Sequence, residues 1–172
     1  MRDLIFIPTY NEKNNISFLL PEIFSAFPNI HILVIDDQSP DGTADQVAKL
    51  QKIYPRLNLL RRSVKNGLGD AYKAAYASVR GQSDIRAIIT MDADGSHQIK
   101  YLKDLLVRIK DYDLVIGSRY IPGGGVENWE WWRQFLSRAG NLYSRLLTGL
   151  PIHDLTAGFI CVRREVVGQI DF

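Results

Sequence analysis

The chain has 172 residues, of which 46% are hydrophobic and 23% are charged, and this composition favours a globular domain over a disordered chain. Its formal net charge of +2 is too close to neutral to indicate nucleic-acid binding, so we expect no nucleic-acid partner. The single cysteine, Cys161, excludes an intrachain disulfide and favours a reducing compartment. No apolar run approaches the roughly 18 residues that a membrane-spanning helix needs. We therefore expect one globular domain.

Short apolar runs alternate with amphipathic segments of helix length along the chain. The expected strands are residues 3–7, 31–35, 58–61, 87–91 and 114–117. The expected helices are residues 16–27, 43–54, 68–80, 99–110 and 131–147, and Pro21 is expected to kink or restart the first of them. This alternation predicts an α/β fold with a mainly parallel sheet and helices on both of its faces.

Polar residues follow four of the expected strands at the point where each strand ends. In chain order these segments are Pro8-Thr9-Tyr10-Asn11-Glu12, Asp36-Asp37-Gln38-Ser39, Asp92-Ala93-Asp94 and Ser118-Arg119-Tyr120. Ligands of open α/β sheets bind outside the carboxyl ends of the strands. We therefore expect these segments to border one ligand site.

The most informative of these segments is the acidic one after the fourth strand. Alternation along an extended chain puts Asp92 and Asp94 on the same side. Two hard oxygen donors so placed suit Mg²⁺ or Mn²⁺, which take their remaining ligands from substrate phosphates and water. A plain surface turn is the alternative interpretation. The second acidic strand end, Asp36-Asp37, favours the metal site.

Several well-known nucleotide sites are disfavoured by the sequence. There is no Gly-x-Gly-x-x-Gly after the first strand and no Gly-x4-Gly-Lys-Ser/Thr motif, which argues against dinucleotide dehydrogenases and P-loop enzymes. No Gly-x-Ser-x-Gly elbow supports a serine hydrolase. A phosphoacceptor receiver domain is also disfavoured, because its acidic pair should close the first strand and Asp36-Asp37 closes the second.

The expected helix at 131–147 carries a second group of polar residues. Arg133 and Ser137 are four residues apart and share one face, where a guanidinium beside a hydroxyl suits a phosphate. An arginine exposed to solvent on an ordinary helix is the alternative. The glycine-rich segment 121–132 before it is expected to be a mobile loop. It holds all three tryptophans, Trp129, Trp131 and Trp132, which favour a membrane–water interface.

Taken together, these segments resemble family 2 glycosyltransferases of the GT-A fold, most closely the dolichyl- and polyprenyl-phosphate mannose synthases. The resemblance covers nearly the whole chain in order. The segments that carry it are 8–12, 34–43, 67–72, 91–94, 117–120, 133–138 and 154–159.

The resemblance implies a GT-A (Rossmann-like) nucleotide-sugar-binding fold and one glycosyltransferase catalytic domain over residues 1–172, truncated at its C-terminus. The implied reaction is an inverting, metal-dependent transfer of a hexose to a polyprenyl or dolichyl monophosphate. The implied donor is GDP-mannose and the implied metal is Mg²⁺ or Mn²⁺. The implied location is cytoplasmic, peripheral at the cytoplasmic face of a membrane.

The resemblance also implies roles for particular residues, which fall into donor, metal, acceptor and catalytic groups. The cofactor-binding residues are Pro8, Tyr10, Glu12, Asp37, Asp92 and Ala93; the metal ligands are Asp92 and Asp94; the acceptor phosphate is received by Arg119, Arg133 and Ser137; and the catalytic residues are Asp94, Arg119 and Arg133. Ser96 stands where some relatives place a metal-binding glutamine.

Two alternatives remain open from the sequence. Residue types do not separate guanine from uracil, so a UDP-glucose enzyme that acts on undecaprenyl phosphate fits the same motifs. A non-catalytic nucleotide-binding domain is the alternative from a different class.

Overall fold

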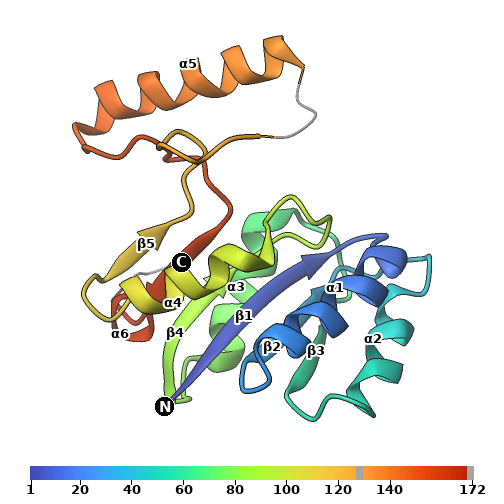
Figure 1. The fold of residues 1–172 in the computed structure, drawn as a ribbon. Coiled ribbons are helices and arrows are strands. Elements are labelled where there is room, and N and C mark those ends of the chain that lie inside the picture. The colour runs from blue at the N-terminus through green and yellow to red at the C-terminus, as the bar shows by residue number, and fades with distance from the viewer. Residues whose placement is uncertain (127–129, 170–172) are drawn as a thin grey trace.

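The computed structural model describes residues 1–126 and 130–169, which form a six-stranded sheet with helices on both faces (Figure 1). The strand order is β3-β2-β1-β4-β6-β5, in which β1 to β4 are parallel and β6 runs antiparallel to both of its neighbours. The strands are β1 (Arg2–Thr9), β2 (His31–Asp36), β3 (Leu57–Arg61), β4 (Ile85–Thr90), β5 (Leu114–Ile116) and β6 (Ile160–Arg163). The predicted α/β fold with a mainly parallel sheet is confirmed.

Apart from α5, the helices divide between the two faces of the sheet (Figure 1). They are α1 (Lys13–Ala26), α2 (Thr43–Gln51), α3 (Leu68–Val79), α4 (Leu102–Arg108), which follows a 3₁₀ turn at Ile99–Tyr101, α5 (Trp131–Thr148) and α6 (Arg164–Val167). Buried side chains of α1, α2 and α4 pack together on one face, and those of α3 with α6 pack on the other. Because both faces are covered, the central strands β1, β2 and β4 are almost continuously apolar, as a parallel sheet requires.

Helix α1 differs from its predicted form. It begins at Lys13, three residues before the expected start, and continues through Pro21 without a restart. Leu20 and Ile23, which flank the proline, are both fully buried. Their packing on the sheet stabilises the helix across the position where proline removes a backbone donor.

Strand β6 was not predicted from the sequence. It inserts between β4 and β5, so that Cys161 pairs with Ile89 on one side and with Val115 on the other. Cys161 is fully buried there, as expected for a small apolar side chain. The segment that leads into β6 passes beside the end of β4, where the Thr90 hydroxyl donates to the carbonyl oxygen of Gly158 at 2.6 Å.

Helix α5 stands apart from the sheet (Figure 1), and Asn141 is the buried residue of this helix. Its apolar side chains are exposed, among them Trp131 at 79%, Phe135 at 66% and Leu146 at 77%. Trp131 and Trp132 form its first turn, so the loop expected at 121–132 ends earlier than predicted, and Trp129 lies outside the described residues. No helix within the described ranges is both long and apolar enough to cross a bilayer.

Candidate functional site

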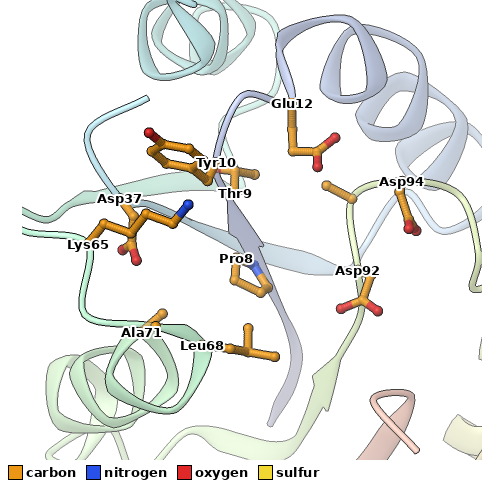
Figure 2. Close-up of a pocket in the computed structure, with 12 residues that line it drawn as sticks. Pro8, Thr9, Tyr10, Glu12, Asp37, Lys65, Leu68, Ala71, Asp92 and Asp94 are labelled. Carbon is orange, nitrogen blue, oxygen red and sulfur yellow. The ribbon is translucent and has the colours of Figure 1, made fainter. Parts of the chain in front are cut away.

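A cavity of about 250 Å³ lies where β1, β2 and β4 end and α3 begins (Figure 2). Every residue that the sequence placed at the donor and the metal lines this cavity. The lining residues are Pro8, Thr9, Tyr10, Glu12, Asp37, Lys65, Gly67, Leu68, Ala71, Asp92, Ala93 and Asp94. Asp92 and Asp94 lie on one side of the cavity, and Tyr10, Asp37 and Lys65 lie on the other. The topology therefore brings three of the four predicted strand ends together at this cavity. The fourth, Ser118-Arg119-Tyr120, does not line it, because β6 separates β5 from β4 in the sheet.

The acidic segment after β4 presents two carboxylates with different surroundings. Asp92 is half-buried, and burial together with the nearby Asp94 raises its pKa, against the opposing effect of His97. Asp94 is exposed, and its Oδ1 accepts a hydrogen bond of 2.9 Å from the backbone N–H of Ser96. Ala93 between them is buried, which turns both carboxylates away from the core.

These two carboxylates suit a hard divalent cation. Within residues 1–126 and 130–169, no group of three or more His, Cys, Asp and Glu side chains is gathered to hold a metal. Asp92 and Asp94 therefore offer two oxygen ligands on the wall of an open cavity. Mg²⁺ and Mn²⁺ are commonly bound in this way, with substrate phosphates and water as the other ligands.

The acidic pair after β2 divides into a structural and a cavity-facing carboxylate. Asp36 accepts hydrogen bonds from the Thr9 hydroxyl at 3.0 Å and from the Ser39 hydroxyl at 2.6 Å, so it holds two strand ends together. Asp37 lines the cavity and pairs with Arg62, with 2.7 Å between Nη1 and Oδ1. Arg62 was not predicted from the sequence, and its guanidinium pairs with the Asp37 carboxylate at a largely buried position.

The loops after β1 and β2 each contain a residue in a backbone conformation that non-glycine residues seldom adopt. Asn11 in the first loop and Gln38 in the second have φ angles of 61° and 56°, in the left-handed region. The backbone N–H of Asn11 donates to the Ser39 hydroxyl at 3.0 Å, which ties this loop to the one after β2. Glu12 is fixed in turn, because its backbone N–H donates to the Thr43 hydroxyl at 3.0 Å.

Lys65 is a cavity residue that the sequence analysis missed. Its Nζ lies 3.2 Å from the centroid of the Tyr10 ring (Figure 2). Among the described residues that line the cavity, Lys65 alone is basic, and it faces four carboxylates. Its position two residues before Gly67, at the start of α3, was the available signal, but no spacing rule connects that loop to Tyr10.

Two of the predicted acceptor residues lie at a second location between the sheet and α5: Arg119 binds Asp154 there, and Ser137 binds Tyr120, the residue after Arg119. Arg119 Nε donates to Asp154 Oδ2 at 2.9 Å and Nη2 donates to Asp154 Oδ1 at 2.6 Å. Burial alone would raise the pKa of Asp154, but the hydrogen bonds and charge of Arg119 outweigh it and hold the pKa below its ordinary value. The hydroxyl of Tyr120 donates to the Ser137 hydroxyl at 2.6 Å, which joins α5 to the same segment.

A second cavity, of about 450 Å³, opens beside this junction. It is lined by Arg119, Tyr120, Ile121, Gly124, Arg138, Asn141, Leu142, Arg145 and His153. Neither Arg133 nor Ser137 is among these residues, so their convergence with Arg119 on one phosphate stays a prediction. The sequence analysis did not predict Arg138, Arg145 or His153 as site residues. The two arginines could have been found, because Arg138, Asn141 and Arg145 are spaced by three and four residues and so share one face of α5.

The sheet order, the acidic strand end and the open cavity at the carboxyl edge define a GT-A fold, and solved structures agree. Glucosyl-3-phosphoglycerate synthase from Mycobacterium tuberculosis, in complex with Mn²⁺, UDP and glucosyl-3-phosphoglycerate, superimposes with a TM-score of 0.69 at 16% identity, over 96% of this chain and 57% of that one. A mannosyltransferase from Pyrobaculum calidifontis, in complex with GDP-Man and Mn²⁺, gives a TM-score of 0.66 at 20% identity, over 98% of this chain and 46% of that one.

Sequence comparison is more specific. The family model "Glycosyl transferase family 2" matches residues 4–171, and the chain belongs to this family. It is 47% identical to a polyprenol monophosphomannose synthase of Mycolicibacterium smegmatis, over 99% of this chain and 64% of the relative. It is 42% identical to an undecaprenyl-phosphate mannosyltransferase of Micrococcus luteus, over 99% of this chain and 70% of the relative. A dolichol-phosphate mannosyltransferase of Pyrococcus furiosus is 35% identical, over 99% of this chain and 49% of the relative. The chain thus spans half to about two thirds of the length of these relatives.

The lowered pKa of Asp154 makes its ion pair with Arg119 sensitive to acid. The stability that the ionised carboxylate contributes is present above its ordinary pKa of 3.8 and is lost as pH falls through the lowered folded-state value. We expect Asp154→Asn to lower the melting temperature at pH 7 and to have a shrinking effect below pH 3.8. The measurement is thermal unfolding between pH 2.5 and 7.

Asp113→Asn is the matched control for that experiment. Asp113 is 74% exposed and lies 3.3 Å from Arg163, so solvent screens its pair and the substitution should change little at any pH. A melting-temperature loss for Asp154→Asn that is the same at pH 7 and at pH 2.5 would contradict the assignment.

Proposed function

We propose that this chain carries the donor and acceptor sites for inverting, metal-dependent transfer of a hexose, mannose from GDP-mannose, to a polyprenyl or dolichyl monophosphate. The observation that carries this proposal is that one short segment, residues 154–158, reaches both cavities. Asp154 binds Arg119 at the second cavity, which we call the cationic cavity because Arg119, Arg138 and Arg145 line it. Gly158 packs against Asp92 at the first cavity, which we call the acidic cavity because four carboxylates line it. The names of the relatives, which are polyprenol-, undecaprenyl- and dolichol-phosphate mannosyltransferases, support the same class of reaction.

The acidic cavity suits a nucleoside diphosphate sugar. Tyr10 offers a ring face to a base, and the carboxylates of Glu12 and Asp37 can accept hydrogen bonds that a guanine edge or a ribose donates. Lys65 supplies positive charge for the diphosphate, and Asp92 with Asp94 would hold the cation. When bound, this cation neutralises the diphosphate leaving group as a Lewis acid.

The acceptor needs little activation by the protein. A phosphate monoester is already anionic at neutral pH, so attack on the sugar requires positioning more than a general base. Arg119, oriented by its two hydrogen bonds to Asp154, and Ser137 would receive this phosphate together with Arg133. In-line attack opposite the leaving diphosphate inverts the anomeric centre.

The exposed face of α5 fits a membrane surface. Trp131, Phe135 and Leu146 project from the helix into solvent, and tryptophan favours the membrane–water interface. With α5 on the membrane, the prenyl chain would stay in lipid while its phosphate reaches the cationic cavity. We therefore place the protein peripherally, at the cytoplasmic face.

Membrane contact predicts a change in tryptophan fluorescence. Two of the three tryptophans start α5, so anionic-lipid vesicles should shift the emission to the blue. Replacing Phe135 and Leu146 by Ser should weaken vesicle binding by about tenfold or more, since each loses buried apolar area. Phe18→Ser, at an exposed apolar position of α1, is the control. Emission that does not respond to vesicles would contradict the placement of α5.

Donor binding tests the proposed chemistry directly. With Mn²⁺ present, GDP-mannose should stabilise the protein against heat more than UDP-glucose at equal concentration. Asp94→Asn should abolish the Mn²⁺-dependent part of GDP-mannose binding in calorimetry while the melting temperature of the free protein stays unchanged, because a neutral amide is a poor ligand for a hard cation. Asp111→Asn, at an exposed position after α4, is the control.

The two readouts address different parts of the proposal. Tighter binding of UDP-glucose would overturn the mannose assignment and leave the metal site intact. Unchanged Mn²⁺-dependent binding in Asp94→Asn would overturn the metal site.

The acceptor site predicts a defect that is confined to transfer. Lysine cannot reproduce the two parallel hydrogen bonds of an arginine to a phosphate. Arg133→Lys should therefore lower the rate of mannosyl transfer to polyprenyl phosphate by at least tenfold, with donor binding within twofold of the unsubstituted protein. Arg138→Lys, on the adjacent helix face that lines the cationic cavity, is the comparison. Normal transfer by Arg133→Lys together with a defect in Arg138→Lys would move the acceptor phosphate to the Arg138 face.

A further inference from the structure

His97 lies against the backbone of Asp92. The backbone N–H of Asp92 donates to His97 Nδ1 at 2.9 Å, so Nδ1 is an acceptor and the neutral ring carries its proton on Nε2. The ring stacks on Phe159, with 4.9 Å between centroids and 12° between planes. The side chain of His97 is only 16% exposed. One bond and one ring contact thus fix its orientation.

The same ring faces the carboxylate that it supports. His97 Nε2 lies 3.6 Å from Asp92 Oδ2, which is longer than a direct hydrogen bond but close enough to favour a charged oxygen at that position. Gly158 approaches the two groups from the segment that leads into β6. A Cβ atom added there would lie 3.4 Å from His97 Cε1 and 3.5 Å from Asp92 Oδ2. The carboxylate is therefore confined between an imidazole and a backbone.

Asp94 has no comparable support from a ring. Its hydrogen bond comes from the backbone of Ser96 in an exposed turn. The two carboxylates are thus held differently, one by a packed aromatic pair and the other by its own turn. Ligands of a metal bind most strongly when neighbouring groups hold them in the bound orientation, and removal of such a group commonly costs 10- to 100-fold in affinity or activity.

We propose that His97 is a positioning residue, which holds the backbone and carboxylate of Asp92 in the orientation that binds the divalent cation. This inference rests on the proposed metal site and adds to it a residue that touches neither donor nor acceptor. The Phe159 ring stacks on the imidazole, and Gly158 packs against both the imidazole and the carboxylate.

Three substitutions of His97 separate hydrogen bonding from packing. Asparagine places an oxygen near the position of Nδ1, whereas glutamine places one near Nε2. His97→Asn should keep the bond from the Asp92 N–H, and His97→Gln should lose it. His97→Phe should keep the ring contact with Phe159 and lose both nitrogen atoms.

The measurement is Mn²⁺ binding by calorimetry at saturating GDP, beside GDP binding in EDTA and thermal unfolding of each variant. We expect His97→Phe and His97→Gln to weaken Mn²⁺ binding by about tenfold or more, and His97→Asn to recover most of it. GDP binding in EDTA should stay within twofold for all three, which a general loss of structure would not allow.

Each possible outcome is decisive. Mn²⁺ affinity in His97→Phe and His97→Gln equal to that of the unsubstituted protein would overturn the positioning role while leaving the metal site standing. Equal losses in His97→Asn and His97→Gln would also overturn it, because the Nδ1 bond would then be irrelevant. A lack of Mn²⁺ binding by the unsubstituted protein would instead overturn the metal site and this inference with it.

Discussion

The ion pair between Arg119 and Asp154 fixes the part of the molecule that no apolar core holds. The Asp154 side chain is fully buried, and a buried carboxylate is tolerated only when it is paired and hydrogen-bonded. Arg119 meets this need with its backbone N–H at 2.9 Å as well as with its guanidinium. The pair joins the segment after β5 to the segment before β6, which are 35 residues apart in the sequence.

Helix α5 depends on this junction because it lacks an apolar interface with the sheet. Its buried Asn141 donates to the Thr156 hydroxyl at 3.1 Å and accepts from the backbone N–H of Leu155 at 2.7 Å. Arg119 donates to the same Thr156 hydroxyl at 2.8 Å. A polar network therefore holds the helix, and none of the described residues covers its apolar face.

The acidic cavity is held in a different way from α5. Here a rigid apolar sheet carries charged side chains at its edge. The strands beneath are largely buried and parallel, so their ends are fixed in register. Four carboxylates face one lysine in the cavity, and like charges so close together are costly unless a cation or a hydrogen-bonding ligand offsets them. This imbalance of charge favours a cation at the cavity over a neutral ligand.

Features that depend on local periodicity could be predicted from the amino-acid sequence alone. Alternating apolar and amphipathic segments predicted the parallel sheet. The strand ends predicted Tyr10, Asp37, Asp92 and Asp94 as neighbours, because parallel strands end at one edge of the sheet.

Features that depend on contacts between distant segments became visible only in the three-dimensional structure. Strand β6 is four residues long and antiparallel, too short for its pattern to be read, and it is β6 that brings Gly158 and Phe159 to Asp92 and His97. Lys65 over Tyr10 and Arg62 on Asp37 join segments with no spacing rule between them. The amphipathic pattern of α5 was visible in the sequence, but a pattern reports that a face is apolar and not what covers it, so only the structure showed that this face lies exposed.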